Sequence, residues 1–277
     1  MQNKPIGIFD SGVGGLSVLR AIREQMPEES VIYFGDQGHI PYGSRPMEQI
    51  QSFSEAITKF LLAQNVKMIV VACNTASAAA LRYLRTTFPD IPFVGMEPAV
   101  KPAAEQTKTG VVGVLATPAT FQGALYASVV ERFAANVELL QNTCVGLVQQ
   151  VEKGDLDGIE TRHILEDALN PMLSKNIDTV VLGCTHYPFV IPLIERIVGD
   201  KVRVIDPAPS VARQAKRLLE AGGLKNPNNA RGNVQYFTSG SEDAMKNLLS
   251  KLLGEDGNVK SVSWSDDHTV NQKYSRS

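Results

Sequence analysis

The chain has 277 residues, of which 43% are hydrophobic and 20% are charged, and its 27 basic and 29 acidic side chains give a formal net charge of −2. This composition is typical of a globular protein with a sizeable core, and the balanced charge gives no sign of a nucleic-acid partner. No apolar stretch is long enough to cross a bilayer, and Asp10 with the glycines after it interrupts any amino-terminal signal segment. We therefore expect a cytoplasmic protein without a membrane or nucleic-acid partner.

Three cysteines are present, at positions 73, 144 and 184. An odd count in a chain of this length does not indicate a disulfide framework. Structural zinc sites of the common type need paired C-x-x-C units, which the sequence lacks. Each cysteine is therefore either a buried core thiol or a reactive one, and its local context has to decide between the two.

Short apolar runs alternate with segments of helical period along the chain. Runs that are apolar on both faces and separated by helices are typical of parallel strands covered on both sides. The pattern predicts an α/β fold. In the first part we expect strands at 5–9, 31–35 and 68–72 and helices at 16–25 and 47–62.

The same alternation continues through the rest of the chain. From Glu255 the sequence is polar, and we expect a weakly ordered tail without a chemical role, in which Val262 and Trp264 could form one short edge strand. The expected strands are at 111–116, 137–140, 179–182 and 234–237, and the expected helices at 121–133, 210–221 and 242–253.

Two pairs of segments resemble each other within the chain. Residues 65–77 (NVKMIVVACNTAS) align with 176–188 (NIDTVVLGCTHYP) at an offset of 111, so that Cys73 falls on Cys184. Residues 6–11 align with 112–117 at an offset of 106. Two pairings in the same order predict two similar parallel-sheet α/β domains related by pseudo-two-fold symmetry, with the active site in the cleft between them.

Domain boundaries follow from this repeat. We expect a discontinuous first domain of residues 1–97 plus 207–254, a second domain of residues 98–206, and the polar carboxyl-terminal tail 255–277.

Cys73 and Cys184 each follow a predicted parallel strand, at the sheet edge where ligands collect in α/β proteins. Polar residues suited to opening a helix come next, Asn74 and Thr75 in one half and Thr185 and His186 in the other. A helix start favours an anion, so it is expected to lower the pKa of the thiol and make it fit for acid–base work.

Two thiols presented from opposite halves suit one kind of reaction. Inverting a carbon centre without a cofactor requires one group to remove a proton from one face and another to deliver a proton to the opposite face. Cys144 lies in a T-C-V-G-L context without a polar companion, and we expect a structural role for it.

Four motifs resemble those of the bacterial glutamate racemases, in the aspartate/glutamate racemase family: DSGVGGLSV at 10–18, PYGS at 41–44, ACNTAS at 72–77 and GCTHYP at 183–188. They occur in the family's order, and the similarity extends from about Ile6 to about Gly254. The resemblance implies a two-domain enzyme that interconverts L- and D-glutamate for peptidoglycan, with no pyridoxal phosphate and no metal, and that often forms a homodimer. It also implies that Cys73 handles the proton of D-glutamate and Cys184 that of L-glutamate.

The resemblance implies supporting roles at matching positions. Asp10 would assist the first thiol and His186 the second, and Glu152 would orient that histidine. Thr117 and Thr120 would close the pocket from the second half. The remaining implied substrate contacts are Ser11, Asn74, Thr75 and Thr185 for the amino and carboxylate groups, and Pro41, Tyr42 and Gly43 for the side-chain carboxylate.

Less specific readings exist for several of these residues. Asp10 and Ser11 are also of types that commonly cap helices. The glycines at 12–15 match neither the G-x-G-x-x-G pattern nor the P-loop pattern of phosphate-binding loops. A metal site on Cys184 and His186 would lack further ligands nearby. His39, His163 and His268 belong to no recognisable constellation and are expected to have solvated or core roles.

Three other functions stay open at this point. The chain could racemise aspartate or another amino acid, it could be a thiol oxidoreductase in which Cys73 and Cys184 form a disulfide, or it could be a binding module on a racemase scaffold. The absence of a C-x-x-C motif disfavours the second, and the retention of both cysteines with Asp10 and His186 disfavours the third.

Overall fold

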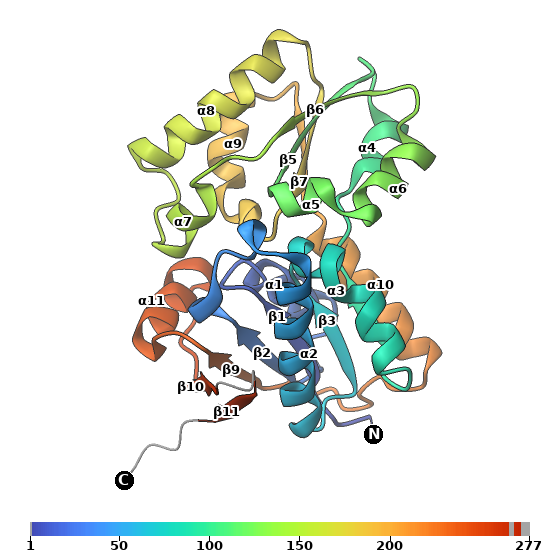
Figure 1. The fold of residues 1–277 in the computed structure, drawn as a ribbon, viewed down its shortest axis with the longest axis vertical. Helices are drawn as coiled ribbons and strands as arrows, with labels where there is room; N and C mark the ends of the chain where they lie inside the picture. Colours follow the sequence, from blue (N-terminus) through green and yellow to red (C-terminus); the bar gives the residue numbers. More distant parts are fainter. Residues whose placement is uncertain (1, 266–268, 273–277) are drawn as a thin grey trace.

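The computed structural model of the protein describes residues 2–265 and 269–272. Figure 1 shows two lobes, each built around a sheet covered by helices. The larger sheet has the strand order β11-β10-β9-β2-β1-β3-β4. Its strands are β1 (Ile6–Asp10), β2 (Val31–Gly35), β3 (Met68–Val71), β4 (Phe93–Gly95), β9 (Val234–Thr238), β10 (Val259–Trp264) and β11 (Val270–Gln272).

The second sheet belongs to the middle of the chain and has the order β6-β5-β7-β8, with all neighbours parallel. Its strands are β5 (Val111–Ala116), β6 (Glu138–Asn142), β7 (Thr179–Gly183) and β8 (Arg203–Ile205). The α/β class and the parallel sheets predicted from the sequence are confirmed. The domain boundaries at 97/98 and 206/207 stay a prediction.

The internal repeat is visible in the topology. The order β2-β1-β3-β4 in the first sheet corresponds to β6-β5-β7-β8 in the second, so the aligned segments 6–11 and 112–117 supply equivalent strands, as do 65–77 and 176–188. Asn65 and Asn176, which align with each other, both have a left-handed backbone with a φ of 61°. Two asparagines in the same rare conformation, each just before an equivalent strand, support the pseudo-symmetry of the two halves.

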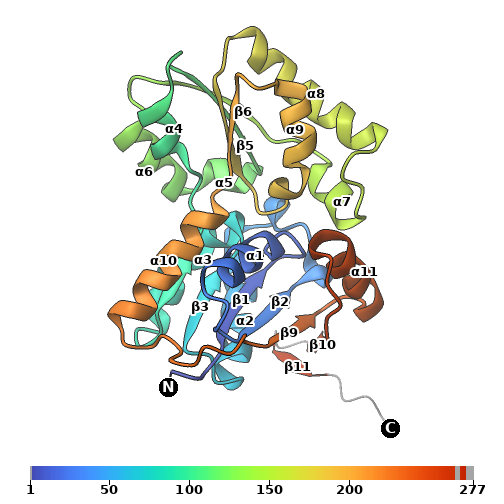
Figure 2. The same ribbon diagram turned by 180° about the vertical axis from the view of Figure 1, so that it is seen from behind.

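Helices cover both faces of the larger sheet. Ile6 and Ile8 of β1 pack in one cluster with α1, α10 and α11, whereas Phe9 packs in another with α2 and α3. Figure 2 shows α1 and α10 side by side, and the two helices are in contact. The helices are α1 (Leu16–Gln25), α2 (Met47–Ala63), α3 (Asn74–Thr87), α4 (Val100–Gln106), α5 (Pro118–Gln122), α6 (Ala124–Phe133), α7 (Leu147–Glu152), α8 (Ile159–Ser174), α9 (Ile191–Val198), α10 (Ala208–Ala221) and α11 (Glu242–Leu253).

Three short 3₁₀ helices complete the elements: η1 (Gln37–His39), η2 (Tyr42–Ser44) and η3 (Tyr187–Val190). Within the described residues, none of the helices combines the length and the apolar character that crossing a bilayer requires.

The helix expected at 121–133 is interrupted. Gly123 adopts an extended conformation with a φ of −71° and a ψ of 137°, which separates α5 from α6. A Cβ atom at this position would lie 2.8 Å from Cβ of Ala78, so the glycine also permits close approach of α3. The hydrophobic period continued through this break and concealed it.

The expectation of a weakly ordered tail is wrong for Val259–Trp264 and Val270–Gln272, which form β10 and β11. β10 pairs in parallel with β9, and β11 pairs antiparallel with β10. A strand forms at Val262 and Trp264 as expected, but it is not an edge strand, because β11, which was not expected, pairs along its outer side. β11 is the edge strand on this side of the sheet. Edge strands carry polar residues toward solvent, so the polar composition hid it. Residues 266–268 and 273–277 of the predicted tail lie outside the described residues.

Candidate active site

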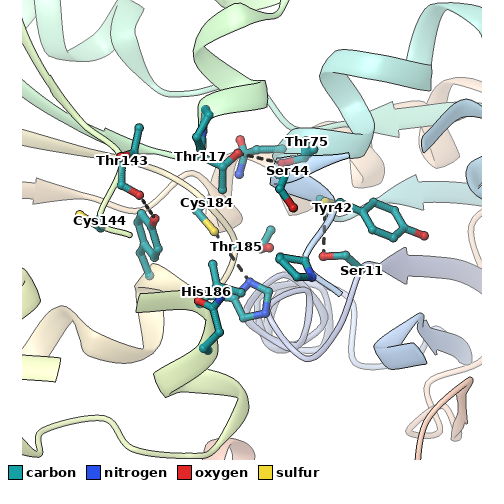
Figure 3. Close-up of a pocket in the computed structure, with 18 of the residues that line it drawn as sticks. Ser11, Tyr42, Ser44, Thr75, Thr117, Thr143, Cys144, Cys184, Thr185 and His186 are labelled. Atoms are coloured by element: carbon teal, nitrogen blue, oxygen red, sulfur yellow. Dashed lines mark hydrogen bonds between the residues drawn. The ribbon is translucent and has the colours of Figure 1, made fainter. Parts of the chain in front are cut away.

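A small cavity of about 180 Å³ lies where the carboxyl ends of the strands of both sheets meet. It includes both cysteines of the repeat, Cys73 from the first half and Cys184 from the second. Figure 3 shows the side chains around it. Its wall consists of residue 11 and the segments 41–44, 73–75, 117–118, 143–146, 148–149 and 184–187.

The first thiol caps the start of α3. Cys73 Sγ accepts a hydrogen bond from the backbone N–H of Ala76 at 3.4 Å, and the thiol donates to Ser11 Oγ at 3.8 Å. Burial raises the pKa of Cys73, the charge of Asp10 raises it further, and the hydrogen bonds from Ala76 and Ser11 only partly oppose this. The expectation that the helix start lowers the pKa of this thiol is therefore wrong, because desolvation outweighs the helix terminus.

Asp10 ends β1 and is completely buried behind the cavity wall. Its carboxylate accepts hydrogen bonds from the Gly12 N–H at 3.0 Å and from the hydroxyl of Thr185 at 3.2 Å, which joins the two halves. Burial raises the pKa of Asp10, although the charge of His186 opposes it.

The second thiol is part of a chain of three groups. Cys184 Sγ lies 3.8 Å from His186 Nδ1, marked by a dashed line in Figure 3, and His186 Nε2 lies 2.7 Å from Glu152 Oε1. Glu152 is held in turn by the backbone N–H of Val13 at 2.7 Å and by Gln37 Nε2 at 3.1 Å. The carboxylate therefore fixes both the position and the orientation of the imidazole.

Electrostatics keeps the His186–Glu152 pair ionised. Burial alone would lower the pKa of His186, but its interactions with Cys184 and Glu152 raise it well above the usual value. Burial alone would raise the pKa of Glu152, but His186 and the Val13 N–H lower it. An imidazolium has an N–H on both nitrogens, one toward the thiol and one toward the carboxylate.

The segment after Cys184 differs from the expected helix start. η3 comes first and α9 begins only at Ile191, so Thr185 and His186 lie in a turn. A proline at 188 and another at 192 limit the backbone N–H donors available here.

Asn74 brings a buried amide to the cavity wall. The residue is 3% exposed, and neither its amide nitrogen nor its amide oxygen has a hydrogen-bond partner among the described residues. Buried amides are nearly always paired, because an unpaired one costs free energy. Since Asn74 lines the cavity, a bound molecule with both a donor and an acceptor would satisfy it.

A row of threonine hydroxyls crosses between the halves. Thr75 Oγ1 lies 2.9 Å from Thr117 Oγ1, which lies 3.0 Å from Thr120 Oγ1. Thr75 and Thr117 line the cavity, whereas Thr120 is buried behind Thr117. The row links α3 to the segment after β5.

The loop 41–44 forms one wall of the cavity. It contains Pro41, Tyr42 and Gly43, for which the family resemblance implies contacts with the substrate. Gly43 approaches the second half so closely that a Cβ atom would lie 3.0 Å from Cβ of Thr117. Tyr42 donates from its hydroxyl to Asp36 Oδ2 at 2.6 Å. Burial, together with Asp36, raises the pKa of Tyr42 well above its usual value.

The segment after β6 was not predicted to reach the site, but it supplies residues 143–146 and 148–149 of the wall. Cys144, assigned to the core, is buried but lines the cavity with a φ of 43°, and burial raises its pKa to about 12. β6 is the counterpart of β2, and the loop after β2 carries 41–44, so the repeat itself could have pointed to this segment. Ser44 and Tyr187 were also missed, although each adjoins a predicted site residue.

Of the predicted site residues, Asp10, Glu152 and Thr120 lie behind the wall, and the others line the cavity. Their roles in binding and catalysis stay predictions. Across residues 2–265 and 269–272, no group of three or more His, Cys, Asp or Glu side chains could hold a metal ion.

The other histidines lie away from the cavity. His163 is exposed on α8 beside Asp167, as expected. His39 does belong to a cluster, because it stacks on Phe53 and lies 3.0 Å from Asp36. His268 lies outside the described residues.

Comparison with known proteins places this geometry among amino-acid racemases. The sequence model of the Asp/Glu/Hydantoin racemase family matches residues 6–215. A glutamate racemase of Ectopseudomonas mendocina (strain ymp) is 48% identical over 255 residues, covering 92% of this chain and 97% of the relative. The glutamate racemase of Francisella tularensis subsp. tularensis SCHU S4, solved in complex with D-glutamate, is similar with a TM-score of 0.82 at 32% identity, covering 95% of this chain and 98% of that one. Escherichia coli glutamate racemase, solved with L-glutamate and activator UDP-MurNAc-ala, has a TM-score of 0.82 at 32% identity, covering 94% of this chain and 98% of that one.

Proposed function

Because this chain belongs to the Asp/Glu/Hydantoin racemase family, we propose that it interconverts L- and D-glutamate by a two-base mechanism without a cofactor. The observation that carries the proposal is the meeting of Cys73 and Cys184 in one small cavity, each from the equivalent strand end of its half. Relatives solved with D-glutamate and with L-glutamate support glutamate as the substrate.

In each direction one cysteine acts as a thiolate and the other as a thiol. The thiolate takes the Cα proton from one face, forming its S–H bond as the Cα–H bond breaks. The opposite thiol then gives its proton to the other face of the carbanion, and the net reaction is inversion at Cα. Cys73 handles the proton of D-glutamate and Cys184 that of L-glutamate.

The residues around the thiols would support proton transfer. His186, held by Glu152, has an N–H toward Cys184 Sγ. It can keep this contact while Cys184 changes between thiol and thiolate. Asp10 acts on Cys73 by its charge, because burial and hydrogen bonding hold the carboxylate behind the wall. An enclosed, pre-oriented site is where such electrostatic effects are strongest.

The substrate would be bound by groups from both halves. The amide of Asn74, which has no partner among the residues described, offers a donor and an acceptor to the amino acid's amino and carboxylate groups, beside the hydroxyls of Ser11, Thr75 and Thr185. Thr117, backed by Thr120, closes the cavity from the second half. The loop with Pro41, Tyr42 and Gly43 would bind the side-chain carboxylate.

We further propose that the protein works as a cytoplasmic homodimer that supplies D-glutamate for peptidoglycan. Its two domains would comprise residues 1–97 plus 207–254 and residues 98–206, with β10 and β11 added to the first sheet.

Polarimetry over a panel of amino acids, each supplied as one enantiomer, tests the proposal. We expect L- and D-glutamate to be brought to an equal mixture, with solvent deuterium entering Cα in D₂O. Racemisation of aspartate but not of glutamate would show that aspartate is the substrate and would contradict the proposal. A thiol oxidoreductase would instead lose two free thiols on oxidation and racemise nothing.

A further inference from the structure

Asp36 is the centre of a hydrogen-bond cluster behind the cavity wall. Its side chain is completely buried, directly after β2. Its carboxylate accepts from the hydroxyl of Tyr42 at 2.6 Å, from the hydroxyl of Ser239 at 2.6 Å and from Trp264 Nε1 at 3.0 Å. The Nδ1 atom of His39 lies 3.0 Å away. Tyr42 and His39 are close to Asp36 in the chain, whereas Ser239 and Trp264 come more than 200 residues after it.

Trp264, the last residue of β10, is the single tryptophan of the chain. Its ring meets the edges of two aromatic neighbours, with centroids 4.8 Å from His39 and 5.3 Å from Phe53. The indole is therefore fixed by packing while its N–H points at the Asp36 carboxylate.

Tyr42 connects this cluster to the cavity. Its segment 41–44 lines the wall, whereas its buried ring points away from Cys184 (Figure 3). The hydroxyl at the far end of that ring is held by Asp36. Asp36 itself is fixed, because its backbone N–H donates to the carbonyl of Asp10 at 2.9 Å.

A buried carboxylate keeps its geometry only while donors satisfy its oxygens. Trp264 and Ser239 both donate to Oδ1, and Tyr42 donates to Oδ2, so the orientation of the carboxylate depends on both ends of the cluster. If the indole N–H is lost, Oδ1 keeps the Ser239 hydroxyl but loses one of its donors, so the carboxylate is held less firmly and the Tyr42 anchor loosens. The loop 41–44 would then be less well placed before substrate arrives.

We propose that Trp264 is a positioning residue for the loop 41–44, acting through Asp36 on Tyr42, so that strand β10 sets how tightly the amino-acid substrate is bound. The inference rests on the proposed function, because it takes this loop as a substrate-binding wall. It gives β10 a role that its sequence did not suggest.

Trp264→Phe keeps an aromatic ring but removes the N–H donor, and Tyr42→Phe removes the donor at the other end. We expect each variant to raise KM for D- and L-glutamate about three- to tenfold, the effect of losing one hydrogen bond, with kcat changed less than about twofold. The double variant should show less than the product of the two effects, because both act through one carboxylate. Lys260→Ala, at an exposed position of the same strand, is the matched control and should leave both constants unchanged.

Hydrogen–deuterium exchange provides a readout independent of activity. In Trp264→Phe, amides of the segment 37–45 should exchange faster than in the unaltered chain, whereas those of α8 should not. Unchanged KM and unchanged exchange in a folded Trp264→Phe, shown by far-ultraviolet circular dichroism, would overturn the inference. So would an equal effect in Lys260→Ala, or fully multiplicative effects in the double variant. If the unaltered chain racemises no glutamate, the proposed function fails, and the exchange experiment still decides whether Trp264 anchors the loop.

Discussion

The two thiols face different electrostatic surroundings. Cys73 is near a buried carboxylate and a serine hydroxyl, whereas Cys184 is near an imidazole held by Glu152. Each thiol has to serve as base in one direction and as acid in the other. Different neighbours therefore imply that the two directions depend on different supporting groups.

Replacing either thiol should stop the reaction. We expect Cys73→Ala and Cys184→Ala to lower kcat by at least about 10²–10⁴-fold, the usual contribution of a general acid–base group. Cys144→Ala should retain turnover, because this thiol lines the wall and has no ionised hydrogen-bond partner within the described part of the chain. Racemisation rates from both enantiomers measure this. Substantial turnover in either of the first two variants would refute the two-base mechanism.

The His186–Glu152 pair predicts a pH-dependent contribution to stability. The pKa of His186 is raised on folding, so its stabilisation is complete below the unfolded-state value of about 6.5 and is lost as the pH rises through the raised value. The pKa of Glu152 is lowered on folding, so its stabilisation is complete above about 4.3 and is lost as the pH falls through the lowered value. His186→Asn should therefore lower the free energy of unfolding by about 1.5–3 kcal/mol between about pH 4.3 and about pH 6.5, and by less at higher pH.

Urea unfolding over a pH series measures this difference. His163→Asn is the control, because its pairing with Asp167 is exposed and should contribute almost nothing. A deficit in His186→Asn that does not shrink as the pH rises would contradict the ionised pair.

At the scale of elements, the turn between β1 and α1 lets the second half come close. A Cβ atom at Gly14 would lie 2.4 Å from His186 Nδ1 and 2.6 Å from Thr185 Oγ1. One at Gly12 would lie 2.1 Å from Glu152 Oε1. These glycines are needed for space at the contact between the lobes, rather than for a phosphate.

Gly14→Ala should therefore displace His186 and lower kcat by about 10²-fold, as misplacements of about 1 Å can do. Gly222→Ala at the end of α10 is the control, because its Cβ atom would meet nothing closer than 3.2 Å and its φ is −86°. Steady-state rates and thermal unfolding of both variants decide the matter. Full activity in Gly14→Ala would show that the contact can open without cost to catalysis.

At the scale of the whole molecule, a buried ion pair lies at the amino ends of the strands of the first sheet, opposite the cavity. Lys67 Nζ lies 2.5 Å from Glu29 Oε2 and also donates to the carbonyls of Gln2 and Leu224. Both charged side chains are almost completely buried. The pair joins the segments before β2 and β3 to the amino terminus and to the segment after α10.

Lys67→Ala would leave the Glu29 carboxylate buried without its cation. We expect the free energy of unfolding to fall by about 3–5 kcal/mol, with kcat and KM of the folded fraction unchanged. Lys59→Ala removes an exposed pair with Glu55 and should cost no more than about 0.5 kcal/mol. Equal losses in the two variants by urea titration would contradict a specific role for the buried pair.

Much of the architecture could be predicted from the sequence. The ranges of α1, β2 and α11 agree with their predicted ranges, and the repeat anticipated the shared strand order of the two sheets. Both repeat cysteines were expected at strand ends and lie there. Hydrophobic period, turn residues and internal similarity are local properties, so they can be read before the chain folds.

Contacts between distant segments decided the rest. The pKa of Cys73 is raised rather than lowered because burial, which no local pattern reveals, outweighs the helix start. The loop after β6 joins the cavity, and β10 and β11 extend the first sheet, because strands far apart in sequence pair side by side. Asp36 accepts hydrogen bonds from Ser239 and Trp264 because the same pairing of strands brings these segments together. The sequence by itself determined which elements form and which thiols lie at the ends of strands. Only the tertiary structure decided what surrounds each charged group, because desolvation and hydrogen bonding depend on neighbours that folding brings together.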